Sequence, residues 1–268
     1  MACAYEGDDT ILYAELYASD SLLLCLEPGT QEAADMRAEA EPRILFQKQI
    51  WGRVDYEREE PNAVLLDLAE YALDGEPFQE QEELLRLDDI CRRRLGYTDR
   101  RGWYEQPWTL KPEPAEHTLA LRFRFCAACE FRNIRLALEQ AAAAEIVLNG
   151  TAVPNEITGW YVDEAIQTLN LPPVRMGENV LTVTIPFGKS TNVEAHYLLG
   201  DFNVRLEGVE KTLVPASNKI GFSSITGQGM PFYGGNLVYS AEIEVPAGDL
   251  EIRLSRYRGA LVRIRLDG

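Results

Sequence analysis

The chain has 268 residues, of which 46% are hydrophobic, so it is long enough for one large or two small globular domains. Its formal net charge of −17 argues against nucleic acid as a partner, because phosphates would be repelled and no basic stripe interrupts the acidic background. No apolar run approaches the ~20 residues of a membrane span, and the start lacks the features of a signal peptide. We therefore expect no nucleic-acid partner and no membrane partner.

The five cysteines are scattered and lack the density of a disulfide scaffold, which favours a reducing, cytoplasmic location. Cys126 and Cys129 have the CxxC spacing of zinc and redox sites, but a four-ligand zinc site needs a second pair that the sequence lacks. The pair also lies between strand-like runs rather than at the start of a helix. We expect these cysteines to be structural, with no metal and no cofactor.

Residues 1–58 are predicted to form a β-sheet segment, the tail of a preceding sandwich. Three runs rich in β-branched and aromatic residues are separated by Ser-Asp and Pro-Gly turn signals. Residues 30–41 are the exception, because they have helix-forming composition but also suit a charged hairpin loop. The three runs are TILYAELYA, SLLLCLE and RILFQKQIWGRVDY.

Residues 59–115 are predicted to form a connector with one helix. An apolar strand at 62–73 ends in an Asp-Gly turn. The segment 80–97 then places apolar residues at helical spacing, with acids near its start, arginines near its end and Gly96 at the C-cap position. Residues 100–116 hold three prolines and no periodicity, which predicts a loop.

The densest basic run of the chain lies within this predicted helix. Arg92, Arg93 and Arg94 follow Asp88 and Asp89 closely, and charge runs of this kind are typical of a solvated helix face. We therefore expect these side chains to be exposed.

From residue 116 onward, short alternating strands are punctuated by Gly, Pro and Asn at the spacing of a sandwich or jelly roll. This pattern predicts a mainly β fold: a jelly roll at 116–210 and an incomplete second jelly roll at 211–268. The predicted strands are LALRFRF, NIRLALE, EIVLNG, AIQTLNL, NVLTVTIPFG, HYLLGDFNVRLEG, NLVYSAEIEV, LEIRLS and ALVRIRLDG.

An internal repeat supports the tandem arrangement. IRLALEQAAAAEIVLNG at 134–150 and IRLSRYRGALVRIRLDG at 252–268 match at seven of seventeen positions. Each copy holds two strand-like runs, and the second run ends in Asn-Gly or Asp-Gly, a strong hairpin signal. Returning strands follow the first copy but not the second. We therefore expect a truncated second sandwich, cut from a larger β-sandwich protein.

The sequence nominates no catalytic residue. Gly188-Lys189-Ser190 resembles the end of a phosphate-binding loop, but the required earlier glycine falls at Val183, inside a strand. His117 and His196 are the only histidines, which excludes a three-histidine metal site and disfavours a Ser-His-Asp triad. Adjacent acids on a helix point in different directions and make poor pairs for glycoside hydrolysis.

Aromatic residues are the more suggestive candidates for function. Exposed aromatic rings can stack on the apolar faces of sugars, and guanidinium groups can donate hydrogen bonds to sugar hydroxyls. Alternatively, the aromatic residues close the ends of a sandwich or seal a domain interface, and the arginines pair with surface acids. The candidate carbohydrate-binding residues are Trp160, Tyr161, Phe232, Tyr233, Arg256 and Tyr257.

Five segments carry a resemblance to a known family. They are EPNAVLLDLAEYALDGE at 60–76, QPW at 106–108, the stretch 159–208, GQGMPFYGGNLVY at 227–239 and SRYRGALVRIRLDG at 255–268. Together they resemble the C-terminal accessory region of bacterial α-L-rhamnosidase-like glycoside hydrolases, which carry sugar-binding, galactose-binding-like jelly rolls. In such proteins the catalytic barrel precedes these modules, and this chain has no segment of alternating strands and helices that could form one.

The resemblance implies tandem galactose-binding-like jelly rolls with a non-catalytic role. They would bind carbohydrate, or support the cleft of a catalytic domain of the same parent protein, in a hydrolase acting on polysaccharide. Two alternatives remain: a purely structural module that packs against a catalytic domain, and a free-standing glycosidase. Sandwiches of this kind can hold calcium, but no oxygen-rich loop here has the ligand pattern that specifies such a site.

Overall fold

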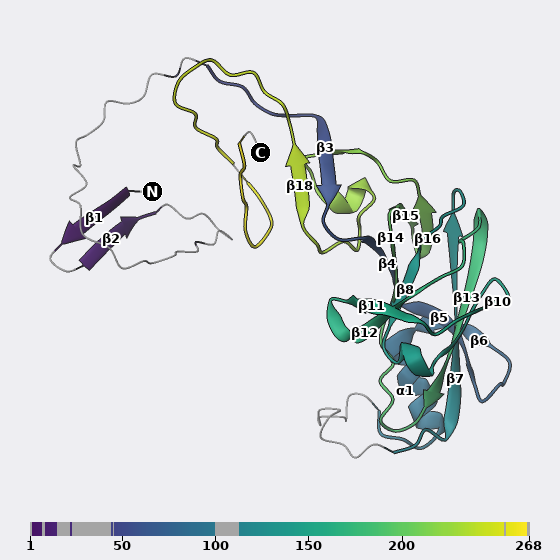
Figure 1. Cartoon of the computed structure of the whole chain (residues 1–268). Helices are drawn as coiled ribbons and strands as arrows, with labels where there is room; N and C mark the ends of the chain where they lie inside the picture. The colour runs from purple at the N-terminus through teal and green to yellow at the C-terminus, as the bar shows by residue number, and fades with distance from the viewer. Residues whose placement is uncertain are drawn as a thin grey trace. The chain divides into compact units, whose positions relative to one another are not determined.

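In the described part of the chain, alternating apolar and polar residues form several β-sheets whose strands are mostly antiparallel, as Figure 1 shows. The computed structural model describes residues 2–6, 9–14, 22, 44, 46–99, 113–254 and 256–266. The described part holds several sheets and one α-helix, which confirms the prediction of a mainly β fold. The chain divides into two compact units, residues 50–242 and residues 1–49 with 243–268.

An eight-stranded sheet forms one layer of the unit 50–242. Its strand order is β10-β9-β13-β7-β16-β15, with β5 also paired to β7 and β6 paired to β5. All of these pairs are antiparallel except β16–β7. The strands are β5 (Leu68–Leu73), β6 (Gln79–Glu83), β7 (His117–Ala127), β9 (Glu145–Leu148), β10 (Thr151–Val153), β13 (Gly177–Phe187), β15 (Asn203–Glu207) and β16 (Glu210–Val214).

A five-stranded antiparallel sheet of order β11-β12-β8-β14-β4 forms the second layer. Its strands are β4 (Asn62–Leu66), β8 (Arg135–Leu138), β11 (Ile157–Tyr161), β12 (Asp163–Asn170) and β14 (His196–Gly200). Every second side chain of the long strands β7 and β13 is buried, as the period of two requires. The core contains buried residues from both sheets, including Leu119, Leu121, Phe123, Leu181, Val183, Leu136, Leu138, Leu169 and Leu198.

The first copy of the repeat joins the two layers. It supplies β8 to the five-stranded sheet and β9 to the eight-stranded sheet, with the 3-10 turn η3 (Ala141–Ala143) between them. Asn149 and Gly150 have φ angles of 51° and 83°, in the left-handed region that a tight hairpin turn needs. They connect β9 to β10, so the predicted Asn-Gly hairpin is confirmed.

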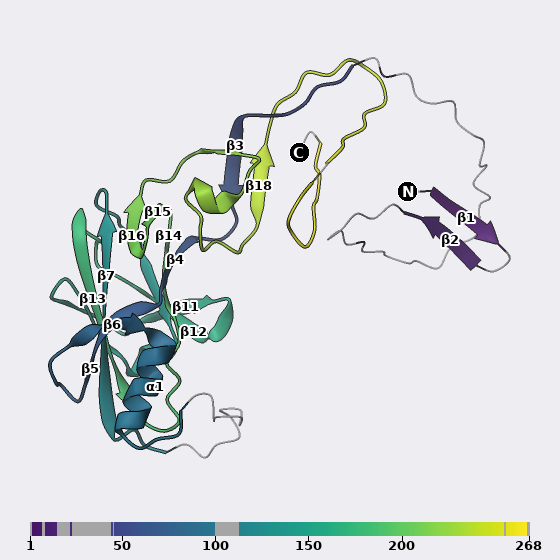
Figure 2. The same cartoon turned by 180° about the vertical axis from the view of Figure 1, so that it is seen from behind.

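The predicted helix is confirmed as α1 (Leu84–Arg94), which contacts β5 and β6, as Figure 2 shows. The Glu83 carboxylate caps its N-terminus by accepting hydrogen bonds from the backbone N–H groups of Leu85 and Arg86, at 3.0 and 3.1 Å. Gly96, with φ of 71°, ends it in the left-handed conformation. The helix buries Leu84, Leu87 and Cys91 in the core.

The prediction that all three arginines are exposed is wrong for Arg92. Arg93 and Arg94 are exposed, but Arg92 is only 2% exposed and Asp88 is fully buried. The reason is that the Arg92 guanidinium is paired with Asp88 and with backbone carbonyls, which offsets the loss of water.

A three-stranded antiparallel sheet completes this unit. Strand β3 (Arg53–Arg58) lies between β17 (Lys219–Gly221) and β18 (Leu237–Ser240). A small core of Ile220, Met230 and Tyr233 packs beside it, next to the short 3-10 helix η4 (Ile225–Gln228). The Asn62 amide links this region to the sandwich by donating to the carbonyl oxygens of Phe202 and Gly229, at 2.8 and 3.0 Å.

Among the described residues of the unit 1–49 with 243–268, β1 (Ala2–Glu6) pairs with β2 (Asp9–Tyr13) as an antiparallel hairpin. The described residues of LEIRLS and ALVRIRLDG form no strand, in contrast to the prediction. A strand needs a partner edge, and within the described range no ladder reaches these residues. The predicted run at 21–27, apart from Leu22, the ambiguous segment 30–41 and most of the loop at 100–116 lie outside the described residues. The predicted boundaries at 58, 115 and 210 stay predictions.

Candidate functional site

The outer face of the five-stranded sheet carries a cluster of half-buried aromatic side chains. Alternation turns one set of side chains in this sheet toward the core and the other set outward. The outward set forms a separate apolar cluster, which we call the aromatic patch. Its buried floor is Ala63, Ala137 and Leu199, and the partly buried side chains around the floor are Tyr161, Ile166, Tyr197 and Phe232.

Strand register explains how this patch forms. Leu199 of β14 lies opposite Ala63 of β4, and Tyr197 lies opposite Ala137 of β8. The small alanine side chains leave room for the neighbouring tyrosine ring to lie over the sheet. The rings of Tyr161 and Tyr197 meet with centroids 5.3 Å apart and planes tilted by 58°. This is within the range of favourable aromatic pairs.

The structure brings together two of the six predicted binding residues. Tyr161 from β11 and Phe232 from the loop after η4 both pack in the aromatic patch, although 70 positions of sequence separate them. Trp160, beside Tyr161 in β11, is 57% exposed and is not among the patch residues. Arg256 and Tyr257 are exposed, belong to the unit 1–49 with 243–268, and are not among the residues of the aromatic patch.

Tyr233, another predicted binding residue, makes structural contacts with both its ring and its hydroxyl. Its ring lies in the small core with Ile220 and Met230. Its hydroxyl contacts Oε2 of Glu60 at 2.8 Å and the carbonyl of Asn236 at 2.6 Å, and its pKa is raised by burial and by Glu60. The Glu60 carboxylate also accepts hydrogen bonds from the backbone and side-chain N–H groups of Asn236, at 2.6 and 3.0 Å. Glu60 therefore links the loop before β18 to the segment that leads into β4.

Besides Ile166 and the floor of the aromatic patch, sequence reasoning missed two polar residues of the site, Tyr197 and Lys211. Tyr197 shows no aromatic motif, and only the alternation of HYLLG could have placed it with Leu199 on one face of β14. Lys211 lies on β16, and its Nζ is 5.8 Å from the centroid of the Phe232 ring. The same ammonium donates to the backbone carbonyl of Leu65 at 2.6 Å and pairs with Asp67, which fixes a cation beside the patch.

The phenol groups of the patch are neutral hydrogen-bonding groups. Burial raises the pKa of Tyr161, and Tyr197 and Glu60 raise it further. Burial likewise raises the pKa of Tyr197, with further contributions from Glu194 and Glu139. Both hydroxyls therefore stay protonated at neutral pH and can donate as well as accept hydrogen bonds.

The histidines and cysteines do not form a metal centre in the part of the chain that the structure describes, where no three His, Cys, Asp or Glu side chains gather. Nδ1 of His117 lies 2.7 Å from the Asp74 carboxylate, whereas His196 is buried in the core beside Phe123. Cys126 is exposed and Cys129 half-buried, and both are free thiols. No helix in the described ranges has the length and apolar character to cross a membrane.

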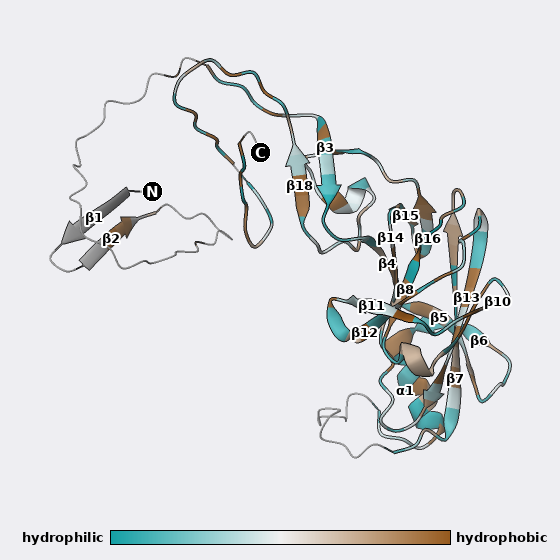
Figure 3. Cartoon of the chain, viewed as in Figure 1, coloured by the Kyte–Doolittle hydropathy of each residue, from teal (hydrophilic) through white to brown (hydrophobic). Residues whose placement is uncertain are grey.

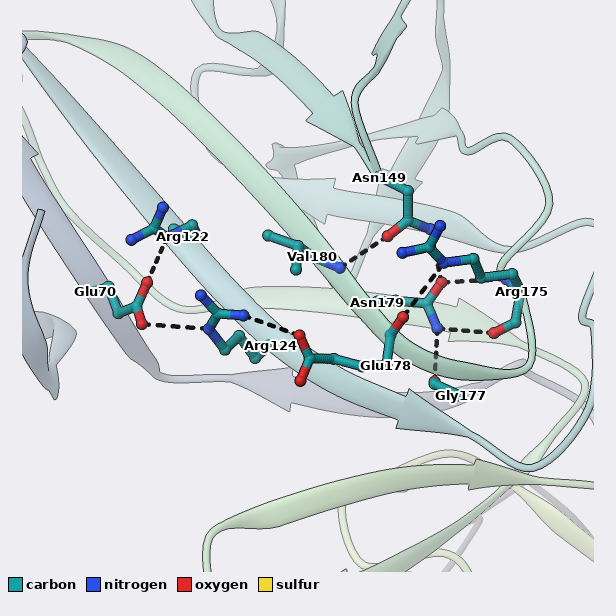
Figure 4. A network of polar contacts seen from close by, with 9 residues as sticks. All are labelled: Glu70, Arg122, Arg124, Asn149, Arg175, Gly177, Glu178, Asn179 and Val180. Carbon is teal, nitrogen blue, oxygen red and sulfur yellow. Dashed lines mark hydrogen bonds and ion pairs between the residues drawn. The ribbon is translucent and has the colours of Figure 1, made fainter.

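The outer face of the eight-stranded sheet carries a charged network instead of an aromatic one, as Figure 4 shows. Glu70 pairs with Arg122, and its other oxygen accepts from Arg124 at 3.2 Å. Arg124 also donates to Glu178 at 2.9 Å, and the Arg122 guanidinium lies 3.7 Å from the ring centroid of Phe78. Partial burial would raise the pKa of Glu70, but the two arginines outweigh it and lower the pKa. Both arginines are thus already engaged.

No protein-family model and no curated protein sequence matches this chain. Among solved structures, the chain is similar to a GH2 β-galacturonidase from Eisenbergiella tayi bound to glycerol, with a TM-score of 0.27 and 15% sequence identity. The match covers 57% of this chain and 28% of that chain, so it spans less than a third of the enzyme's length.

Proposed function

We propose that this chain is a non-catalytic β-sandwich region of a bacterial glycoside hydrolase that binds carbohydrate through the aromatic patch and so supports a substrate cleft. The observation that carries the proposal is the meeting of Tyr161, Tyr197 and Phe232 over a floor of small side chains. The motifs that resemble the accessory region of rhamnosidase-like hydrolases point the same way. The parent enzyme and its polysaccharide substrate are part of this proposal.

The chemistry of the patch suits a sugar. A pyranose ring presents an apolar face of C–H groups that stacks on an aromatic ring, while its hydroxyls need hydrogen-bonding partners. Tyr161 and Tyr197 offer both, because each has a half-buried ring and a protonated hydroxyl. Since the rings are already packed against one another, little side-chain entropy is lost on binding.

Binding of this kind has an electrostatic signature. The patch itself consists of uncharged side chains, and the nearby Lys211 is paired with Asp67. We therefore expect weak binding to a neutral polysaccharide that changes little with salt, because the contacts are stacking and neutral hydrogen bonds.

The test uses isothermal titration and affinity electrophoresis of the full chain against plant and bacterial polysaccharides. Tyr161→Ala and Tyr197→Ala should each abolish or weaken retention, whereas Trp160→Ala, which removes an exposed aromatic residue outside the patch, should leave it unchanged. Equal loss with all three variants, or no retention of the wild-type chain on any glycan, would count against the proposal.

A second candidate function is an interaction module that packs against a catalytic domain without binding sugar. The observation that favours it is the number of exposed apolar side chains at 245–266. A wild-type chain that binds no glycan but associates with a separately expressed catalytic domain in size-exclusion chromatography would support this alternative. Turnover of aryl glycosides by the purified chain would instead support a free-standing glycosidase.

We also propose a cytoplasmic location. The thiols of Cys91, Cys126 and Cys129 are free, which is usual for proteins of reducing compartments and supports this assignment. Fractionation of the source cells, with thiol labelling of the protein in each fraction, tests it.

A further inference from the structure

A second group of aromatic rings lies apart from the aromatic patch, at the three-stranded sheet. The rings of Phe222 and Tyr239 have centroids 5.4 Å apart and planes that differ by 18°, so they are stacked almost in parallel. Neither ring is among the residues of the patch or of the small core beside this sheet. Phe222 is 55% exposed and Tyr239 is 39% exposed. We call these two residues the stacked pair, and much of its surface is open to a ligand.

Strand register and a change of chain direction bring the two rings together. Tyr239 lies on β18, directly opposite Tyr56 of β3. Phe222 comes directly after Gly221, the last residue of β17, where the chain leaves the sheet. In Figure 3 the start of β18 is brown and therefore hydrophobic, whereas the arrowhead of the adjacent β3 is teal. The stacked pair thus joins β18 to a loop whose own strand is not its neighbour, since β3 lies between β17 and β18.

One side-chain amide orders the loop that carries Phe222. Oε1 of Gln228 accepts the backbone N–H of Gly221 at 2.8 Å, and Nε2 of Gln228 donates to the Gly221 carbonyl at 3.1 Å. The same Nε2 lies 3.2 and 3.3 Å from the carbonyl oxygens of Ser223 and Ser224. Because the protein itself makes these contacts, a ligand at Phe222 meets a loop that is already ordered, which lowers the entropy cost of binding.

The same loop carries hydroxyl groups close in sequence to the exposed ring. Ser223, Ser224 and Thr226 are exposed, and each hydroxyl can donate as well as accept a hydrogen bond. Burial raises the pKa of Tyr239, so its hydroxyl also stays protonated at neutral pH. An open ring face with hydroxyls around it suits a sugar, because the C–H face of a pyranose stacks on the ring while its hydroxyls exchange hydrogen bonds.

A short segment of chain connects the stacked pair to the aromatic patch. Phe232 packs in the patch, and Tyr239 follows seven positions later. Seven residues span at most about 25 Å when fully extended. On the way, Tyr233 and Leu237 pack in the small core of the same compact unit. A chain of several sugar units can therefore reach both places, whereas a monosaccharide occupies one at a time.

We propose that Phe222 and Tyr239 form a second stacking site for the polysaccharide that binds at the aromatic patch, so that one glycan chain spans both. This inference rests on the proposed carbohydrate function and adds the ligand class: a neutral polymer long enough to bridge two sites. Two weak contacts on one chain reinforce each other, because the second site binds at a high effective concentration once the first is occupied.

The test is isothermal titration of the full chain with galactan, arabinan and xyloglucan, and with the monosaccharides of each. Phe222→Ala should weaken binding of the retained polysaccharide by about tenfold or more, because the second contact is lost, and should leave monosaccharide binding at the patch unchanged. Phe222→Tyr keeps the flat ring and should bind like the wild type. Phe222→Leu keeps apolar bulk without a flat ring and should lose affinity as Phe222→Ala does.

The matched control is Val238→Ala, which removes an exposed apolar side chain next to Tyr239 that alternation turns to the other face of β18. This control should bind like the wild type. Equal losses for Phe222→Ala and Val238→Ala, or wild-type affinity of Phe222→Leu, would overturn the proposal, because the ring would then have only a packing role.

Tyr197→Ala in the same titrations separates this proposal from the one on which it rests. Weaker polysaccharide binding with Tyr197→Ala but not with Phe222→Ala would overturn the second site and leave the aromatic patch as the binding site. No binding of any of these glycans by the wild-type chain would overturn both proposals. Melting curves of each variant by circular dichroism show separately whether the chain is folded.

Discussion

The Nε of Arg92 donates hydrogen bonds to both carboxylate oxygens of Asp88, one helical turn away, at 3.0 Å each. Both side chains are buried. The same guanidinium donates from Nη1 to the carbonyl of Lys189 at 2.9 Å and from Nη2 to that of Thr191. This single side chain therefore fastens α1 to the turn that follows β13.

Replacing Arg92 by Met should destabilise the chain strongly. The substitution keeps the apolar stem but leaves the buried Asp88 carboxylate without its guanidinium, and uncompensated buried charges of this kind cost about 3–5 kcal/mol. Urea unfolding at pH 7 measures the loss. Arg93→Met, at the exposed neighbouring position, should change the free energy of unfolding by less than about 0.5 kcal/mol. Similar losses for both variants would contradict the assigned role.

The buried His196 should make stability depend on pH. Burial lowers its pKa to about 4 from the ordinary value of 6.5, although backbone contacts at Glu194 and Ala195 raise it slightly. Its Nε2 finds no hydrogen-bond partner among the described residues. Between pH 6.5 and 4 the unfolded chain binds a proton at this position and the folded chain does not, so the stabilisation present above pH 6.5 is lost as pH falls. The loss is about 3 kcal/mol across this window.

Urea unfolding of the wild type and of His196→Leu at pH 7.5, 5.5 and 4.6 tests this expectation. The variant should be at least as stable at pH 7.5 and should show a much flatter decline toward pH 4.6. Carboxylates with lowered pKa, such as Glu70 and Asp74, lose their contribution only below their ordinary values of 4.5 and 3.8. Parallel curves for the two proteins above pH 4.6 would show that His196 is not the titrating group.

The turn before β13 depends on one buried amide, shown in Figure 4. Asn179 donates from Nδ2 to the carbonyls of Arg175 and Gly177, at 2.8 and 3.1 Å, and accepts the Arg175 N–H at 3.1 Å. It also accepts from the side chain of Asn149 at 2.8 Å. Asn179→Ala removes all four contacts, and leaving such groups unpaired costs about 1–3 kcal/mol each where they stay buried.

Asn179→Ala should therefore lower the melting temperature clearly, by about 10 °C for a loss of 3 kcal/mol in a domain of this size. Differential scanning calorimetry measures the shift. The matched control is Glu178→Gln, because Glu178 has an exposed side chain whose pair with Arg124 is worth about 1 kcal/mol or less. If Asn179→Ala were as stable as this control, water would have to replace the hydrogen bonds that Asn179 makes to the backbone of the turn.

The elements that could be predicted from the sequence are those whose conformation depends on residues close together in the chain. The helix α1 has apolar spacing and a C-terminal glycine, and the Asn149-Gly150 turn has its own conformational preference, so both were found from the residues alone. The burial of Arg92 could not be found this way, because its carbonyl partners at Lys189 and Thr191 lie about a hundred positions along the chain.

The aromatic patch shows the same limit. Alternation in HYLLG places Tyr197 on one face of its strand, but only the strand order brings β14 between β8 and β4 and so supplies Ala137 and Ala63 as neighbours. Tyr233 shows the reverse case, a residue proposed for binding because it is aromatic that in fact has a structural role. It lies one position from Phe232, yet its ring packs in the small core and its hydroxyl contacts Glu60, so it is not part of the patch.

The contribution of ring stacking and of the hydroxyl group at Tyr197 should be separable. Tyr197→Phe keeps the ring that meets Tyr161 and removes only the hydroxyl, so the affinity for a bound oligosaccharide should fall by no more than about tenfold, the effect of one hydrogen bond. Tyr197→Ala removes the ring as well, and the additional loss should be about 0.5–1.5 kcal/mol, the usual range for an aromatic contact. Isothermal titration of both variants against the polysaccharide retained by the wild type measures the two losses. If Tyr197→Ala bound as tightly as Tyr197→Phe, the ring would not contact the sugar, and Tyr197 would serve only to pack Tyr161 against the sheet.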